Sequence, residues 1–200
     1  MSKGEQTRQM IVARAAQVFN KQGFFGASFD DLMRETGMKK GGIYNHFRSK
    51  DELAVEAFNY AINVVWARIE QELAGKANAV DRLIAMLVGY RALIEDPPLS
   101  GGCPLLNTAV ETDDDDAELP TLRQSARDAL SRWRRWIGRN VARGIAAGEI
   151  RPDVDSDLLA TILISTVEGS VMMSKLDNDP THIRRAVEHL SAYLESVVRA

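Results

Sequence analysis

Apolar residues recur every three or four positions along most of the chain, which is the period of an amphipathic α-helix. No stretch shows a convincing alternation of apolar and polar residues, the pattern typical of a strand. The chain is therefore predicted to be all-α, with about nine helices. The longer ones cover residues 6–22, 49–73, 79–95, 118–147 and 156–176, and a last helix follows Pro180.

Between the first two long helices, the chain carries the start and stop signals of short ones. Ser28, with Asp31 three residues later, is an N-terminal capping pair, and Gly37 ends the helix that this pair starts. A second short segment follows the glycine, and Ser49 with Glu52 forms a full capping box that opens the next long helix. Two short helices across a glycine turn predict a helix-turn-helix.

The second short segment, residues 39–46, is polar and contains two adjacent glycines. Gly41 and Gly42 each weaken a helix by about 1 kcal/mol relative to alanine. They indicate either a loop between helices or a bare backbone that comes close to a partner. Cations, a phenol and an amide beside such a backbone suit a phosphate-lined DNA groove. The polar residues of this segment are Lys39, Lys40, Tyr44, Asn45 and His46.

The sequence Gly-x-Ile-Tyr-x-His-Phe-x-Ser-Lys-x-x-Leu at 41–53 resembles the DNA-binding domain of TetR-type (tetracycline-repressor-like) transcriptional regulators. The resemblance implies a three-helix DNA-binding domain at 1–50 and a ligand-binding and dimerisation domain at 51–200, with the boundary inside the helix 49–73. The matching residues are Gly23, Ser28, Phe29, Leu32, Gly37, Gly41, Ile43, Tyr44, Phe47, Ser49, Lys50 and Leu53.

The resemblance also implies which residues contact DNA, because the third helix of this family enters the major groove. Tyr44 and Lys50 would hold phosphates. The chain departs from the family at Lys39, where Ser or Thr usually caps the helix at a gain of about 1 kcal/mol, and at Gly42, where many members carry Ser or Thr. The full DNA-binding set is Ser28, Lys39, Lys40, Gly41, Gly42, Tyr44, Asn45, His46 and Lys50.

Charge is distributed unevenly along the chain, whose formal net charge is −3. Residues 1–50 hold nine Lys/Arg and four Asp/Glu, whereas 51–200 hold sixteen and twenty-four. A basic N-terminal part beside an acidic remainder is expected if only the first part touches DNA. In the first helix, Lys3, Arg8 and Arg14 can either approach phosphates or stay solvated.

Composition indicates an ordinary globular protein, since 45% of the residues are hydrophobic and 26% are charged. No apolar run approaches the roughly 18 residues of a membrane span, and the N-terminus lacks the apolar core of a signal peptide. A single cysteine excludes an internal disulfide. We therefore expect a cytoplasmic protein without a membrane partner.

The last helix carries apolar residues at spacings of 4, 3, 4 and 3, which is the seam of a coiled coil. Together with the preceding helix it could pair with its copies as a four-helix bundle. The alternative is that the stripe covers only the chain's own core. The resemblance favours a homodimer, with an interface made by Ile162, Ile183, Val187, Leu190, Leu194 and Val197.

Cys103 is the first candidate for sensing a signal. It follows Ser-Gly-Gly and precedes Pro104, which fits the first turn of a helix, so the thiol is expected at an N-cap with a lowered pKa. The segment from Gly102 to Glu111 also resembles that of TetR-type regulators that respond to electrophiles. The alternative is a small structural residue beside an ordinary ligand pocket. Further candidates are Lys175, as a cationic neighbour, and Trp133.

No cofactor or metal site is predicted. The acidic run 113–116 lacks the glycine and glutamate of a calcium loop, because Glu118 and Gln124 stand in their places, so a solvated loop is expected. An enzyme with Cys103 as nucleophile would need a nearby base. The three histidines leave none, because one belongs to the DNA-binding segment and two lie on the last helix.

These observations predict a homodimeric transcriptional regulator, a repressor that leaves a palindromic double-stranded DNA operator when its second domain binds a small molecule. An electrophile reacting with Cys103 is a second form of that signal. The alternative is a DNA-binding regulator or scaffold that takes no ligand.

Overall fold

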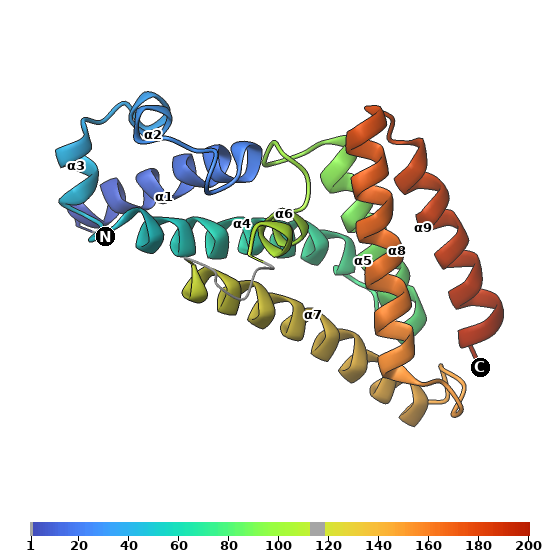
Figure 1. The fold of residues 1–200 in the computed structure, drawn as a ribbon. Coiled ribbons are helices and arrows are strands. Elements are labelled where there is room, and N and C mark those ends of the chain that lie inside the picture. The colour runs from blue at the N-terminus through green and yellow to red at the C-terminus, as the bar shows by residue number, and fades with distance from the viewer. Residues whose placement is uncertain (1, 113–118) are drawn as a thin grey trace. The chain divides into compact units, whose positions relative to one another are not determined.

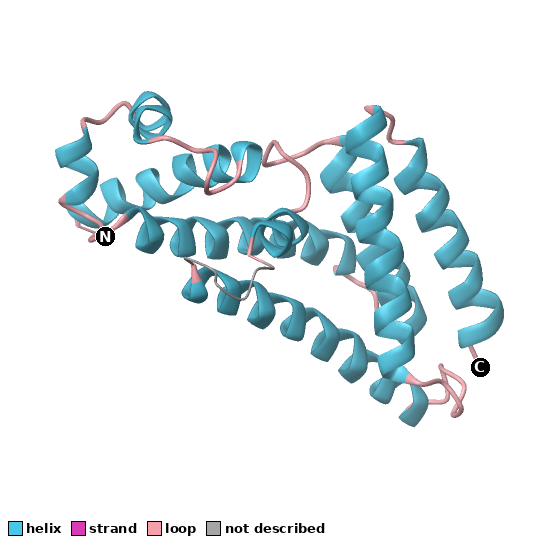
Figure 2. Ribbon diagram, in the orientation of Figure 1, coloured by secondary structure: helices cyan, strands magenta, loops and turns pink. Residues whose placement is uncertain are grey.

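The computed structural model describes residues 2–112 and 119–200, and in this part of the chain helices are joined by loops and turns, with no strand (Figures 1 and 2). The all-α prediction is confirmed. The acidic run 113–116 lies outside the described residues. The helices are α1 (Lys3–Gln22), α2 (Phe29–Thr36), α3 (Lys40–Tyr44), α4 (Lys50–Leu73), α5 (Ala79–Glu95), α6 (Pro104–Glu111), α7 (Pro120–Ala146), α8 (Ser156–Asp177) and α9 (Thr181–Tyr193), with a π-helical turn η1 (Leu194–Val198).

The chain forms two compact units. Unit 1 contains the described residues of 1–64 and 98–129, and unit 2 contains 65–97 and 130–200. The division falls inside α4 and again inside α7, so that α6 belongs to the same unit as the helix-turn-helix. The functional split into a DNA-binding domain at 1–50 and a ligand-binding and dimerisation domain at 51–200 stays a prediction.

Unit 1 is built around a core shared by α1, α2, α3 and the first half of α4. Helix α1 begins three residues earlier than predicted because Ser2 caps it. The Glu5 N–H donates to Ser2 Oγ at 3.2 Å, and the Ser2 N–H donates to Glu5 Oε2 at 2.6 Å. The fully buried side chains of this core include Ile11, Ala15, Leu32, Ile43 and Leu53.

Unit 2 is a layer of helices in which α9 packs on both α5 and α8, and Figure 1 shows α8 and α9 side by side. Helix α5 also approaches the second half of α4 closely. A Cβ on Gly89 would lie 2.9 Å from Ile69 Cα, so only glycine fits at that crossing. The largest buried side chains of this core include Leu83, Met86, Leu87, Ile137, Leu163 and Ile183.

Most of the seam predicted on the last helix is buried within the chain and does not face outward. Ile183, Val187, Leu190 and Leu194 are each at most 2% exposed, because α5 and α8 of the same chain cover them. The alternative, that this stripe covers the chain's own core, therefore holds. Of the predicted interface, Ile162 and Val197 remain exposed, each at 43%.

Helix α8 is the most apolar long helix of unit 2. This helix is long and apolar enough to cross a membrane, by length and composition alone, which the sequence analysis did not expect. A single such helix is weak evidence, because helices of protein cores have the same composition. One side of α8 is buried in unit 2, and its opposite side exposes Leu158, Met172, Met173 and Leu176.

Candidate nucleic-acid interface

Helix α2 has the ends that the sequence predicts. Ser28 Oγ accepts from the Asp31 N–H at 3.1 Å, the Asp31 carboxylate accepts from the Ser28 N–H at 3.0 Å, and Gly37 closes the helix in the left-handed region at φ 70°. Hydrogen bonds from the Ser28 hydroxyl and backbone, and then from Arg34, lower the pKa of Asp31 to about 2. The Ser28 hydroxyl is therefore engaged in holding the start of α2.

Helix α3 follows this turn and includes both adjacent glycines, so the interpretation of Gly41 and Gly42 as an interhelical loop is wrong. Lys39 occupies the N-cap and makes no side-chain capping bond, as its residue type predicts. A Cβ on Gly41 would meet nothing within 4 Å, whereas one on Gly42 would lie 2.9 Å from Met38 Cε. The backbone of α3 is therefore bare at Gly41 and free for close approach.

Two apolar residues hold α3 on unit 1 and leave its polar side outward. Ile43 is 1% exposed and Phe47 2% exposed, so the anchors of this segment lie in the core. The opposite side presents a continuous polar surface. Its exposed or half-buried residues are Lys39, Lys40, Gly41, Gly42, Tyr44, Asn45 and His46.

An aromatic stack supports this surface. The rings of Phe29 and Tyr44 stack with centroids 5.2 Å apart, and the Lys40 ammonium lies 4.7 Å over the Phe29 ring. Because Phe29 is the first residue of α2 and Tyr44 the last of α3, the stack joins the two helices of the motif. The cation of Lys40 is thereby held at the edge of the exposed surface.

Not every basic residue of unit 1 is available to DNA. The Arg8 guanidinium pairs with both oxygens of Glu56 and lies 4.6 Å over the Phe47 ring. Its hydrogen bond to that carboxylate raises the pKa of Arg8 above its usual value. Arg14 faces Glu35 at 3.4 Å. Arg8 therefore serves the packing of α1 on α4, whereas Arg14 makes only an exposed ion pair with α2.

Lys50, predicted to hold a phosphate, lies instead within unit 1. Its Nζ donates to the Phe24 carbonyl oxygen at 2.6 Å and lies 4.2 Å over the Phe24 ring. Burial lowers the pKa of Lys50, while the nearby Asp51 and Glu111 carboxylates act in the opposite direction. The ammonium thus holds the turn between α1 and α2 in this structure, and its phosphate contact stays a prediction.

The capping box predicted at the start of α4 is present in part. The Glu52 N–H donates to Ser49 Oγ at 3.1 Å, as expected. The Glu52 carboxylate, however, accepts from the Arg48 N–H at 2.7 Å rather than from Ser49. The return bond is shifted by one residue and still satisfies a backbone donor before α4.

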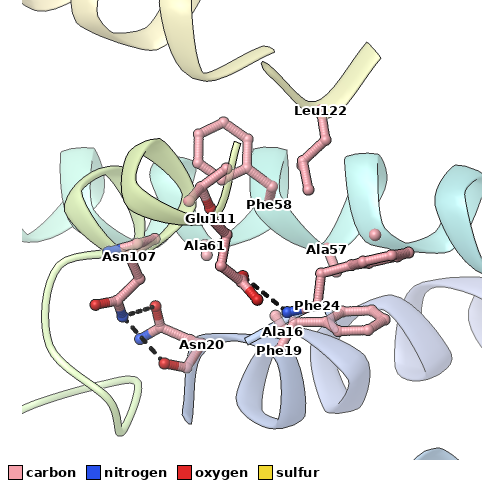
Figure 3. A pocket seen from close by; sticks show the side chains of 13 residues that line it. Ala16, Phe19, Asn20, Phe24, Ala57, Phe58, Ala61, Asn107, Glu111 and Leu122 are labelled. Atoms are coloured by element: carbon pink, nitrogen blue, oxygen red, sulfur yellow. Dashed lines mark hydrogen bonds between the residues drawn. The ribbon is translucent and has the colours of Figure 1, made fainter. Parts of the chain in front are cut away.

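Sequence reasoning missed the residues that tie α6 to the end of α1. Figure 3 shows Asn20 and Asn107 facing each other, with Asn107 Nδ2 donating to both the Asn20 carbonyl oxygen and Asn20 Oδ1 at 3.1 Å. It also shows Glu111 directed at the backbone nitrogen of Phe24. Asn107 and Glu111 lie four residues apart and therefore on one face of α6. This spacing is the one feature of the sequence that could have indicated a shared contact.

A small cavity of about 30 Å³ lies among these residues, roughly the space of two water molecules. Phe19, Phe24 and Phe58 form its apolar wall, and Asn20, Asn107 and Glu111 its polar wall. It is too small for an effector of several heavy atoms.

Two of the predicted sensor residues, Cys103 and Lys175, belong to different units. Cys103 is at the N-cap of α6, as predicted, but its side chain is only 4% exposed. Lys175 is exposed on α8 and belongs to unit 2, whereas Cys103 belongs to unit 1. The thiol is buried and not accessible to solvent, which favours a structural role for Cys103.

Trp133 lies in the interior of unit 2. It stacks on Tyr90 with centroids 4.6 Å apart and planes 12° apart, and its Nε1–H points to Met86 Sδ at 3.1 Å. The Tyr90 hydroxyl donates to Glu168 Oε1 at 3.1 Å. An aromatic pair with a carboxylate therefore lies between α5, α7 and α8.

Comparisons with known proteins agree with this geometry. Residues 11–57 match the family described as "Bacterial regulatory proteins, tetR family", and residues 79–190 match the "Tetracyclin repressor-like, C-terminal domain". The chain is 27% identical over 176 residues to the HTH-type transcriptional repressor DhaR of Mycobacterium sp. (strain GP1), covering 86% of this chain and 84% of that protein.

Solved structures give the same result. A TetR transcriptional regulator from Chloroflexus aurantiacus J-10-FL is 46% identical and superposes with a TM-score of 0.93 over 100% of this chain and 99% of that one. A TetR-family regulator from Cytophaga hutchinsonii is 31% identical, with a TM-score of 0.86 over 99% and 98% of the two chains. The chain belongs to the TetR family of bacterial transcriptional regulators, and the helix-turn-helix of α2 and α3 is its DNA-binding motif.

Proposed function

We propose that the chain acts as a homodimeric repressor that binds a near-palindromic operator in the cytoplasm and leaves it when a small molecule binds unit 2. The observation that carries the proposal is the surface of α3, where polar and cationic side chains face outward while Ile43 and Phe47 are buried. A short helix held in this way is suited to the major groove.

On this proposal, the contacts divide by chemistry. Asn45 and His46 reach base edges, because an amide can bind adenine in a bidentate manner and an imidazole can donate or accept. Lys39 and Lys40 bind guanine edges or phosphates, and Tyr44 donates to a phosphate. Gly41 and Gly42 let the backbone approach the DNA and read no base themselves.

A homodimer is needed because one α3 covers only one half-site. The exposed side of α8 offers the interface, since Leu158 is 60% exposed, Met172 55% and Leu176 83%. Together with Ile162, Ser165 and Gly169 these residues lie at spacings of 4, 3, 4, 3 and 4, a coiled-coil seam. A second copy presenting the same uncharged stripe is the partner that fits, with Tyr193 and Val197 of the C-terminal helices beside it.

The effector site is proposed in unit 2, around the aromatic pair of Tyr90 and Trp133. Aromatic rings with one carboxylate are typical linings of small-molecule sites between helices. Glu168 and the thioether of Met86 would set the orientation of a bound molecule. The alternative, a DNA-binding protein without an effector, predicts that no small molecule changes operator affinity.

Selection of duplexes from a random pool, followed by fluorescence anisotropy, tests this proposal. A near-palindromic consensus should emerge, and binding should weaken steeply with salt because phosphate contacts release counterions. Asn45→Ala should cost about 1–3 kcal/mol and relax specificity at one base pair. Glu70→Gln on the exposed side of α4 is the control. A pool that yields no consensus, with binding equal for all duplexes, would count against an operator-specific regulator.

A further inference from the structure

Two side chains of opposite charge hold the turn between α1 and α2. Glu111 binds the backbone N–H of Phe24, and Lys50 binds its carbonyl oxygen. The Phe24 N–H donates to Glu111 Oε2 at 2.8 Å, and the Phe24 carbonyl oxygen accepts from Lys50 Nζ at 2.6 Å. The Phe25 N–H donates to the other oxygen, Glu111 Oε1, at 3.2 Å. Hydrogen bonds to ionised partners are about twice as strong as neutral ones, so this turn is fixed from both sides.

The backbone of the turn is shaped to admit the carboxylate. Gly23 has φ 77°, and a Cβ at this position would lie 2.4 Å from Glu111 Oε1. Any other residue would therefore strain the backbone and also displace the carboxylate. The Phe24 side chain, 8% exposed, stacks on Phe19 at 5.8 Å and closes the same site from the core.

A second set of hydrogen bonds keeps α6 in place to make this contact. Asn107 Nδ2 donates to the carbonyl oxygens of Asn20 and Gly101, at 3.1 and 2.9 Å. Asn20 Nδ2 in turn donates to the carbonyl oxygens of Ser100 and Gly102, at 2.8 and 3.0 Å. The approach is again close, because a Cβ on Gly101 would lie 2.1 Å from the Asn20 carbonyl oxygen. All these residues belong to unit 1.

The position of the turn matters for DNA because the chain enters α2 directly from it. Ser28 caps α2 three residues after Phe25, and the stack of Phe29 on Tyr44 carries the placement of α2 to α3. We propose that Glu111, which lies outside the helix-turn-helix, is a positioning residue for DNA binding. It fixes the α1–α2 turn, and through the turn the orientation of α2 and α3 on α1.

The positioning role, which rests on the proposed DNA-binding function, predicts a change in operator affinity opposite to the one expected from net charge. Removing a carboxylate makes a protein more positive, and simple electrostatics would then strengthen its binding to DNA. If Glu111 positions the recognition helix, Glu111→Ala should instead weaken operator binding. We expect the operator affinity to fall about tenfold. A charge-assisted hydrogen bond changes an equilibrium constant by at least that factor, and the partial exposure of the turn keeps the effect at the low end.

The experiment measures the affinity of full-length variants for the selected duplex at 25 °C and one salt concentration. Glu111→Gln keeps the shape and one good acceptor, so it should fall between the wild type and Glu111→Ala. Glu70→Gln removes the same charge from an exposed position of α4 and should leave binding unchanged or slightly stronger. Hydrogen exchange provides a readout without DNA: the amides of Phe24 and Phe25 should exchange several-fold faster in Glu111→Ala and at the wild-type rate in Glu70→Gln.

Two results would overturn the positioning role. Glu111→Ala could bind the duplex as tightly as Glu70→Gln while its thermal stability falls, which would make the contact a purely structural one. Alternatively, the amides of Phe24 and Phe25 could keep their protection, which would mean that the carboxylate does not hold the turn. If the wild-type chain bound no duplex, the DNA-binding function would fail, and the positioning role would fail with it.

Discussion

Replacing Lys50 by methionine should lower the stability of unit 1 without removing a phosphate contact. Methionine keeps an unbranched stem that can still cover Phe24, but it removes the ammonium. That ammonium donates to the Phe24 carbonyl oxygen at 2.6 Å and lies 4.2 Å over the Phe24 ring. Lys50 also lies within the family motif, where the resemblance implies a phosphate contact, so the variant separates the two roles.

The structure sets the size of the effect. A hydrogen bond from a charged donor contributes about 1.5–3 kcal/mol, and a cation–π contact at a partly exposed site about 0.5–1 kcal/mol. The desolvation that lowers the pKa of Lys50 opposes both gains. A net loss of about 1–2 kcal/mol is therefore expected on Lys50→Met, or a fall in Tm of about 2–8 °C for a chain of this length.

Urea unfolding measures the loss in the free energy of unfolding, at one fixed protein concentration because the stability of a dimer depends on it. The salt dependence of operator binding shows whether a phosphate contact has been lost. Operator affinity falls as salt rises, and losing one phosphate contact makes the slope of log K against log salt shallower by about 1. Lys50→Met should leave that slope unchanged. Lys39→Met, which changes the exposed lysine at the N-cap of α3, should leave the stability unchanged and reduce the steepness of the salt dependence. A Lys50→Met variant with unchanged stability and a slope lowered by about 1 would refute the structural role.

Three further predictions follow from the described residues. Met172→Asp with Leu176→Asp should give monomers in sedimentation, whereas Leu190→Asp should unfold unit 2 because that side chain is 2% exposed; a dimeric double variant would place the interface elsewhere. Cys103 should react with thiol reagents far more slowly than free cysteine in the native protein, and rapid labelling would restore it as a sensor. The Asp31 carboxyl should titrate with a pKa of about 2, below its ordinary 3.8. Its contribution to stability should thus be complete above pH 3.8 and lost as the pH falls toward 2, and an NMR midpoint near 3.8 would contradict this.

The secondary structure could be predicted because its signals are local. Ser28 with Asp31 at one end of α2 and Gly37 at the other act within a few residues, and the structure shows both ends as expected. The early start of α1 was also readable, since Ser2 and Glu5 have the spacing of a capping box. The outward polar face of α3 follows from the same local reasoning.

The burial of the helical stripes could not be predicted in the same way. Both α8 and the last helix carry apolar residues at coiled-coil spacing, and periodicity says only that something covers each stripe. Leu190 is covered by the chain itself, while Leu176 remains 83% exposed. Which of two similar stripes faces the core depends on tertiary packing, so the spacing alone could not show that the stripe of the last helix is the buried one.

The roles of Lys50 and Glu111 depend on contacts between distant segments. Glu111 bonds to a residue 87 positions earlier in the chain, and Lys50 to one 26 positions earlier. No spacing rule links such positions, because they meet only when α4 and α6 have packed on the end of α1. A motif match can locate Lys50, but it cannot show which atoms its ammonium meets.

The most direct test of DNA recognition by α3 is a methylation-protection footprint on the selected duplex, because dimethyl sulfate reacts with guanine N7 in the major groove. Two protected patches, related by two-fold symmetry and about one helical turn apart, 10–10.5 base pairs, are predicted. The protection should disappear from both patches in Asn45→Ala with Lys40→Ala. Protection confined to the minor groove, or major-groove protection that survives these substitutions, would contradict recognition by α3.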